Sequence, residues 1–210
     1  MKPFLFITDF DGTITAQDFF LQIMYRYQHD RIFSKDKKRG VELLSSVLEE
    51  VDLTKEQFLE EIKYIPMDKT FIDFYRFFKK IGGDILVLSA GSKYYIEKKL
   101  KLEGIEDILI CANGGNFEDG SFKFYTNKDE RFFCPVFGVD KKKVISIYKE
   151  KYEKIFYAGD SYVDFDACRI ADFRFAKKNL VDILKKFKLK FYEFENFDDI
   201  RKKINNLVNF

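Results

Sequence analysis

Short apolar runs alternate with amphipathic stretches along most of the chain. The runs have the length and the aliphatic or aromatic content of buried strands at 4–7, 85–88, 108–111 and 155–158. Apolar residues recur every three or four positions, as on one face of a helix, over 71–80, 92–103, 141–151 and 163–170. Strands that alternate with helices are typical of a parallel sheet covered on both faces. We therefore expect an α/β fold with a doubly wound parallel sheet.

The segment at 15–67 differs, because its pattern is helical throughout. Amphipathic spacing predicts helices over 18–28 and 40–51. The sequence from Thr54 to Gln57 is a capping box, which opens a third helix that ends near Pro66. This segment directly follows the first strand. We therefore expect a helical cap at 15–67, inserted into a catalytic core formed by 1–14 and 68–210.

The remaining elements are shorter. A hairpin is predicted over 115–125, with its turn at Asp119-Gly120. Edge strands are predicted at 173–175 and 190–194, and the chain is expected to end on a helix.

Composition excludes several classes of protein. Apolar residues make up 46% of the 210-residue chain and charged residues 34%, a globular balance with a net charge of +2. The basic cluster at 141–143 is balanced by acidic neighbours, so we expect no nucleic-acid partner. No stretch approaches the ~20 apolar residues of a membrane span, so we expect no membrane partner. Three scattered cysteines favour a reducing, cytoplasmic setting.

Candidate chemistry begins where the first strand ends. Asp9 follows the apolar run at 4–7, and open α/β sheets bind their ligands at the carboxyl ends of strands. Asp11 points the same way because strand side chains alternate with period two. Two carboxylates this close repel each other unless a cation lies between them or one is protonated. The pair is typical of half of a Mg²⁺ site that handles phosphate.

Three further elements follow in order at strand ends or helix starts. Ser89-Ala90-Gly91 lies where a strand gives way to a helix, and free N–H groups there can bind phosphate. Lys141 opens a later helix, and Asp160 and Asp164 follow the strand at 155–158. Each feature alone is as readily a turn, a helix cap or a solvated side chain. Their joint order is what indicates a site.

This order resembles the haloacid dehalogenase-like hydrolase superfamily, whose core is a Rossmann-like sheet. Residues 9–13 match its first motif, D-x-D-x-T, and Ser89 matches the hydroxyl residue of its second. Lys141 resembles the lysine of the third motif, and 159–164 matches the fourth, G-D-x-x-x-D. The helical insertion is similar to that of the phosphoserine phosphatase-like branch. The strings at 9–15 and 89–100 resemble the methionine-salvage phosphatase family more narrowly, although the cysteine-rich insert of that family is absent.

The resemblance implies a role for each residue. Asp9 would be the nucleophile that forms an aspartyl phosphate, and Asp11 the general acid and base. Asp9, Asp160 and the backbone carbonyl of Asp11 would hold Mg²⁺. The groups that would bind phosphate are Gly12, Ser89, Ala90, Gly91 and Lys141, with Thr13 and Asp164 behind them. Asp18 would face the substrate from the start of the cap, or alternatively cap a helix. His29 matches no motif.

The leading hypothesis is a Mg²⁺-dependent phosphatase acting on a small phosphorylated metabolite. A phosphotransferase that uses an acceptor other than water has the same sequence features. A third alternative is a non-catalytic, phosphate- or metal-binding regulatory module, which is disfavoured because Asp9, Asp11 and Asp160 are all present. The sequence does not indicate an oligomeric state.

Overall fold

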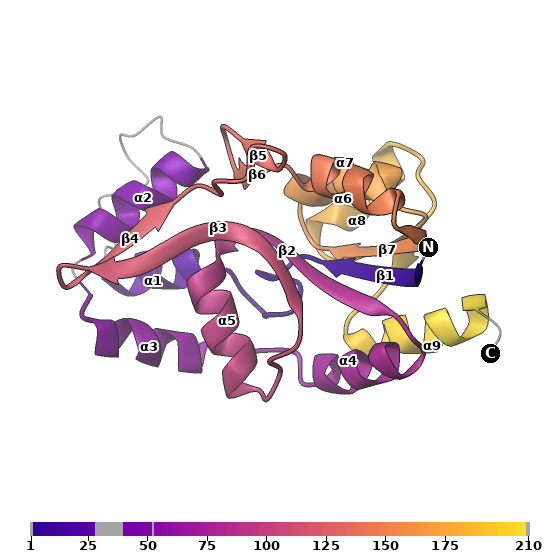
Figure 1. The fold of residues 1–210 in the computed structure, drawn as a ribbon, viewed down its shortest axis with the longest axis horizontal. Helices are drawn as coiled ribbons and strands as arrows, with labels where there is room; N and C mark the ends of the chain where they lie inside the picture. Colours follow the sequence, from indigo (N-terminus) through magenta and orange to yellow (C-terminus); the bar gives the residue numbers. More distant parts are fainter. Residues whose placement is uncertain (1, 28–39, 52, 209–210) are drawn as a thin grey trace.

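A seven-stranded sheet forms the centre of the computed structural model, which describes residues 2–27, 40–51 and 53–208 (Figure 1). The strand order is β4-β3-β2-β1-β7-β8-β9, parallel except for the antiparallel β3–β4 pair. The strands are β1 (Lys2–Thr8), β2 (Asp84–Ser92), β3 (Leu109–Glu118), β4 (Ser121–Tyr125), β7 (Tyr152–Gly159), β8 (Phe173–Ala176) and β9 (Tyr192–Glu193). The predicted α/β class is confirmed.

Helices cover both faces of this sheet, because successive strand residues point to opposite sides. Phe6 and Phe156 contribute to a phenylalanine-rich face, and Leu5 and Tyr157 to the other. The first face is covered by α4 (Thr70–Lys80), α5 (Lys93–Leu102) and α9 (Phe197–Val208). The second is covered by α6 (Lys141–Lys149), α7 (Phe165–Ile170) and α8 (Asn179–Lys186). None of the described helices is long and apolar enough to cross a membrane.

Between β1 and α4, the described residues of the insertion form three helices, namely α1 (Phe19–Tyr27), α2 (Val41–Glu50) and α3 (Lys55–Tyr64). The capping box predicted at Thr54 is present at the start of α3. The two chain segments that join the insertion to the core run antiparallel. The Ala16 N–H donates to the Pro66 carbonyl at 2.9 Å, and the Asp68 N–H donates to the Ile14 carbonyl at 2.9 Å. This pairing is consistent with cap limits at 15 and 67, which stay a prediction. His29 lies outside the described residues.

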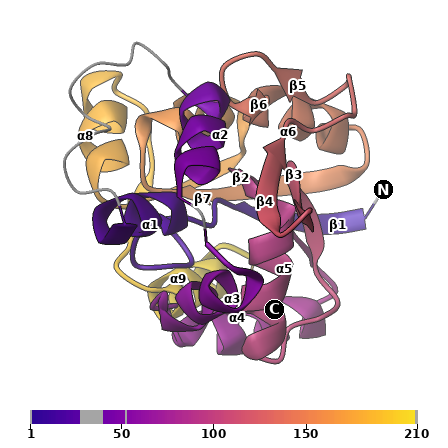
Figure 2. The same cartoon turned by 90° about the vertical axis from the view of Figure 1, so that its left-hand side faces the viewer.

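The β3–β4 hairpin extends from the sheet towards the inserted helices (Figure 2). It turns at Asp119-Gly120 as predicted. Its rings pack on the insertion, because Phe122 stacks on Phe58 with ring centroids 4.4 Å apart. Aromatic contacts of this kind contribute beyond the area that they bury. The hairpin therefore ties the insertion to the sheet.

Several local predictions are wrong. The predicted strand at 108–111 and the first hairpin strand are one long strand, β3. The segment at 173–175 is not an edge, because β9 pairs outside it. Neither α8 nor the small hairpin of β5 (Phe133–Cys134) and β6 (Gly138–Val139) was predicted. Two-residue strands are too short to show a period, whereas α8 has an apolar face of Leu180, Val181 and Leu184 that the sequence analysis missed.

Candidate active site

The strand register brings the predicted site residues to one edge of the sheet. Thr8 at the end of β1 pairs with Val87 on one side and with Ala158 on the other. The carboxyl ends of these three strands therefore lie at the same edge of the sheet, where Asp9, Ser89 and Asp160 come together. A cavity of about 440 Å³ opens there. Its core side is lined by Asp9, Asp11, Gly12, Ser89, Ala90, Gly91, Lys141 and Asp160, and its other side by Gln17, Asp18, Phe20, Leu21 and Leu44.

Lys141 lies between two buried carboxylates. Its Nζ is 2.8 Å from Asp9 Oδ1 and 2.7 Å from Asp164 Oδ1. Burial alone would lower the pKa of Lys141, but Asp164 and Asp9 raise it above its ordinary value. Burial raises the pKa of Asp9 to about 7, against the opposing effect of Lys141. Lys142 and Lys143 are exposed, so Lys141 is the lysine that faces the site.

Asp164 is fully engaged behind this pair. Its Oδ1 accepts a hydrogen bond from the Tyr157 hydroxyl at 2.6 Å as well as from Lys141. Its Oδ2 accepts from the backbone N–H groups of Asp160 at 3.0 Å and Ser161 at 3.1 Å. Asp164 therefore orients the lysine and the loop that carries Asp160.

Lys178 is a second cation at the cavity, which the sequence analysis missed. Its Nζ lies 3.1 Å from Asp160 Oδ2 and donates to the Gly12 carbonyl at 2.6 Å. Lys177 donates to the Thr13 carbonyl at 2.7 Å. Lys178 has a positive φ of 49°, a conformation that non-glycine residues rarely adopt. The only sequence signal was a pair of lysines after a strand.

The loop after β1 is closely packed against Asp160. Gly12 has a φ of 75°, and an added Cβ would collide with Asp160 Oδ2, so any other residue here would be strained and would displace the Asp160 side chain. Two predicted phosphate-binding N–H groups have internal partners: Gly12 donates to Thr15 Oγ1 at 3.3 Å, and Gly91 donates to Ser89 Oγ at 2.9 Å. Thr13 is buried, and its hydroxyl has no partner among the described residues.

Asp11 has different surroundings from Asp9. Its Oδ1 accepts a hydrogen bond from the Phe19 N–H at 3.0 Å, and its Oδ2 accepts from the Tyr95 hydroxyl. Burial, with a further contribution from Asp18, raises the pKa of Asp11 well above its usual range. Asp18 caps α1 by accepting from the Leu21 N–H at 2.9 Å, and it also lines the cavity.

The oxygen atoms at this edge fit a magnesium ion. Carboxylate oxygens of Asp9, Asp160 and Asp164 lie within 4.8 Å of one another. The backbone carbonyl of Asp11 accepts no hydrogen bond within the described part of the chain. Burial and the neighbouring Asp164 raise the pKa of Asp160, against the opposing effect of Lys178. Because the hydrogen bonds of Asp164 are already made, Asp9, Asp160 and the Asp11 carbonyl are the available ligands.

Known proteins of similar sequence identify the family of this chain. The family described as "Putative Phosphatase" matches residues 4–206. The chain belongs to this family. It is similar to the polyol phosphate phosphatase PYP1 of Saccharomyces cerevisiae, at 29% identity over 95% of this chain and 92% of that protein. It is also similar to the 2-hydroxy-3-keto-5-methylthiopentenyl-1-phosphate phosphatase of Lysinibacillus sphaericus, at 27% identity over 99% and 96% of the two chains.

Solved structures show the same fold for this Putative Phosphatase member. Phosphoserine phosphatase in apo form superposes with a TM-score of 0.71 at 19% identity, over 96% of this chain and 98% of that one. A phospho-aspartyl intermediate analogue of phosphoserine phosphatase gives a TM-score of 0.70 at 20% identity, over 97% and 99%. The resemblance to the haloacid dehalogenase superfamily is confirmed, and the protein is a phosphatase of that type.

Proposed function

We propose that the protein is a Mg²⁺-dependent phosphatase that hydrolyses a small phosphomonoester through an aspartyl phosphate. One observation carries the proposal: buried Asp9 is ion-paired to Lys141 at 2.8 Å and lies beside Asp160 at the floor of a cavity. A buried carboxylate with a fixed ammonium beside it is suited to attack an anionic phosphorus centre.

The proposed reaction has two steps, the transfer of the phosphoryl group to Asp9 and its release to water. Asp9 attacks phosphorus and forms an acyl phosphate bond, while the bond from phosphorus to the leaving oxygen breaks. Asp11 gives its proton to that oxygen, so an alcohol departs and Asp11 becomes a carboxylate. Asp11 then takes a proton from water, and the resulting hydroxide attacks phosphorus and releases Asp9. Lys141 and Ser89 hold the phosphoryl oxygens throughout.

Asp9, Asp160 and the backbone carbonyl of Asp11 would hold Mg²⁺, because oxygen ligands are those that this ion prefers. When bound, the ion supplies positive charge against the repulsion between a carboxylate and a phosphate dianion, which is about 8 kcal/mol at ~4 Å and an effective dielectric constant of ~20.

The lining of the cavity supports a substrate with an uncharged leaving group. Among the described residues that line it, the cations are Lys141 and Lys178, and both lie against core carboxylates. The cap side offers Phe20, Leu21 and Leu44 beside polar groups of Gln17 and Asp18. Among the described residues of that side, none is a cation that would pair with a substrate carboxylate. A polyol or sugar phosphate fits it, and the name of the yeast relative points to the same class.

A magnesium titration tests the metal and the reaction together. Phosphate release from p-nitrophenyl phosphate is measured against Mg²⁺ concentration for the parent, Asp160→Ala and the control Asp166→Ala, which alters an exposed carboxylate of α7. We expect Asp160→Ala to need more Mg²⁺ and to lose activity, whereas the control behaves like the parent. Full activity after exhaustive chelation, or the same Mg²⁺ requirement in all three proteins, contradicts the proposed site.

A substrate comparison tests the leaving group. With the parent protein, we expect kcat/KM to be higher for glycerol 1-phosphate than for 3-phosphoglycerate, which has a carboxylate in place of the terminal hydroxymethyl group. O-phosphoserine serves as a further comparison. A clear preference for either carboxylate-bearing substrate contradicts the assignment of an uncharged leaving group.

A further inference from the structure

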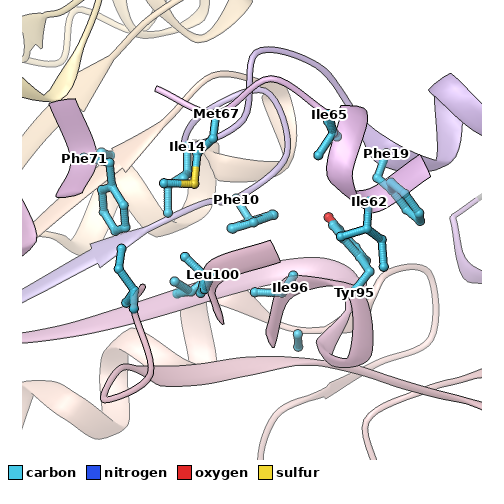
Figure 3. Packing of buried hydrophobic residues seen from close by; sticks show 14 of the residues in the cluster. Phe10, Ile14, Phe19, Ile62, Ile65, Met67, Phe71, Tyr95, Ile96 and Leu100 are labelled. Carbon is cyan, nitrogen blue, oxygen red and sulfur yellow. The ribbon is translucent and has the colours of Figure 1, made fainter. Parts of the chain in front are cut away.

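Tyr95 is a buried tyrosine whose hydroxyl reaches the site from behind. It lies in the first turn of α5, and its side chain is fully buried. Its ring stacks on Phe19 with centroids 4.5 Å apart and packs edge-on against Phe10 at 5.6 Å (Figure 3). The ring of Phe20 also lies 5.6 Å away, nearly perpendicular to that of Tyr95. Amid these rings, the hydroxyl donates its hydrogen bond to Asp11 Oδ2. A buried hydroxyl without a partner would be costly, so this contact fixes the ring and the carboxyl together.

The space around this contact is closed. An added Cβ at Gly91 would lie 2.9 Å from Asp11 Oδ2 and 2.9 Å from the Tyr95 hydroxyl. The second oxygen of Asp11 is held by the Phe19 N–H, which is the first backbone donor of α1. Asp11 is therefore held by the inserted helix on one side and by α5 on the other.

We infer that Tyr95 is a positioning residue for Asp11: its hydroxyl holds the Asp11 carboxyl in one place while that group gives up and regains a proton. A tyrosine hydroxyl can both donate and accept a hydrogen bond. It donates to Asp11 when Asp11 is a carboxylate, and it can accept when Asp11 carries the proton. A phenylalanine of the same shape can do neither. The inference rests on the proposed function, because it assigns Tyr95 a part in the proton transfer proposed for Asp11.

The test compares two leaving groups. The variants are Tyr95→Phe and the matched control Tyr94→Phe, which loses a hydroxyl from a ring packed against Phe117 and Phe122. kcat and KM are measured on p-nitrophenyl phosphate, whose leaving group needs little protonation, and on glycerol 1-phosphate. We expect Tyr95→Phe to lower kcat on glycerol 1-phosphate about tenfold, the effect of one hydrogen bond to a charged group. The loss on p-nitrophenyl phosphate should be smaller, and KM should change little.

A double-mutant cycle shows whether the effect passes through Asp11. In an Asp11→Asn background, Tyr95→Phe should have no further effect on kcat, because the group that it positions no longer transfers a proton. Equal losses of kcat on the two substrates, equal losses in the two backgrounds, or activity like the parent each overturn the inference and leave the proposed function standing. If the parent hydrolyses neither substrate with Mg²⁺, the proposed function itself fails.

Thermal denaturation is followed for every variant. Tyr95→Phe keeps the ring and its contacts, so we expect it to fold. Should it not fold, Phe19→Leu removes the ring that stacks on Tyr95 while keeping the hydroxyl. We then expect a smaller loss of kcat that is again greater for glycerol 1-phosphate, and equal losses on the two substrates contradict the inference.

Discussion

Asp9 and Asp11 are two residues apart in one loop, yet they lie in opposite kinds of surroundings. Asp9 faces a charged floor, with the Lys141 ammonium at 2.8 Å and the carboxylates of Asp160 and Asp164 nearby. Asp11 faces an aromatic wall, where its partners are the uncharged donors of Phe19 and Tyr95. The Lys141 ammonium favours the charged form of Asp9, whereas burial and the neighbouring Asp18 favour a proton on Asp11. The surroundings, and not the residue type, distinguish the proposed nucleophile from the proposed acid.

The largest loss of activity is expected when Asp9, beside the Lys141 ammonium, is replaced. Asp9→Asn keeps the shape of the side chain but removes the charge and the nucleophilic oxygen, so we expect multiple turnover to be abolished while the fold is retained. Phosphate release and the thermal denaturation midpoint are the measurements. Appreciable multiple turnover by purified Asp9→Asn protein contradicts a covalent role for Asp9.

Asp11→Asn tests whether the carboxyl beside Phe19 and Tyr95 is the general acid. General acid catalysis contributes about 10²–10⁴-fold, and most where the leaving group is a basic alkoxide. We expect a loss of kcat in this range on glycerol 1-phosphate and a smaller loss on p-nitrophenyl phosphate. If the two losses are equal, Asp11 is not the general acid, and the proposed division of roles between Asp9 and Asp11 is wrong.

Lys141→Met tests how much the ammonium beside Asp9 contributes to activity and stability. The substitution keeps the length of the buried side chain and removes the ammonium that faces Asp9 and Asp164. Loss of a fixed electrostatic group of this kind lowers kcat by about 10²–10³-fold, and uncompensated buried carboxylates lower stability. kcat and the thermal denaturation midpoint are compared with those of Lys142→Met, an exposed neighbour that should match the parent. Parent-like kcat in Lys141→Met would remove the lysine from the site.

The smallest effect is expected at Lys178, whose side chain is 44% exposed whereas that of Lys141 is 4% exposed. Its ammonium contacts Asp160, so we expect it to compete with Mg²⁺ for that carboxylate. We expect Lys178→Met to reach half-maximal activity at a lower Mg²⁺ concentration, with a change in kcat of at most about tenfold. Lys177→Met is the matched control, because Lys177 binds the Thr13 carbonyl instead. A higher Mg²⁺ requirement in Lys178→Met, or the same shift in both variants, contradicts this competition.

Much of the fold was predictable, because its long elements carry their own periodicity. The helix over α4 and the strand over β7 have apolar patterns that agree with where they are buried. Prediction failed for β5 and β6, whose lengths are too short for a period, and it missed α8 despite the apolar face of Leu180, Val181 and Leu184. It also failed for β3, because the run at 109–118 passes through two glycines, Gly114 and Gly115, that resemble a turn in the sequence.

The sequence by itself determined which residues we propose to carry the chemistry of the site, because each motif is local: a strand end, a short loop, a helix start. It placed Asp9, Asp11, Ser89, Lys141 and Asp160 in order, and the parallel register of the sheet then brings them together. Only the tertiary structure decided their partners. Tyr95 is 84 residues from Asp11, and Lys178 is 166 residues from Gly12. Contacts over such separations form only when helices pack on the sheet, and no local pattern in the chain encodes them.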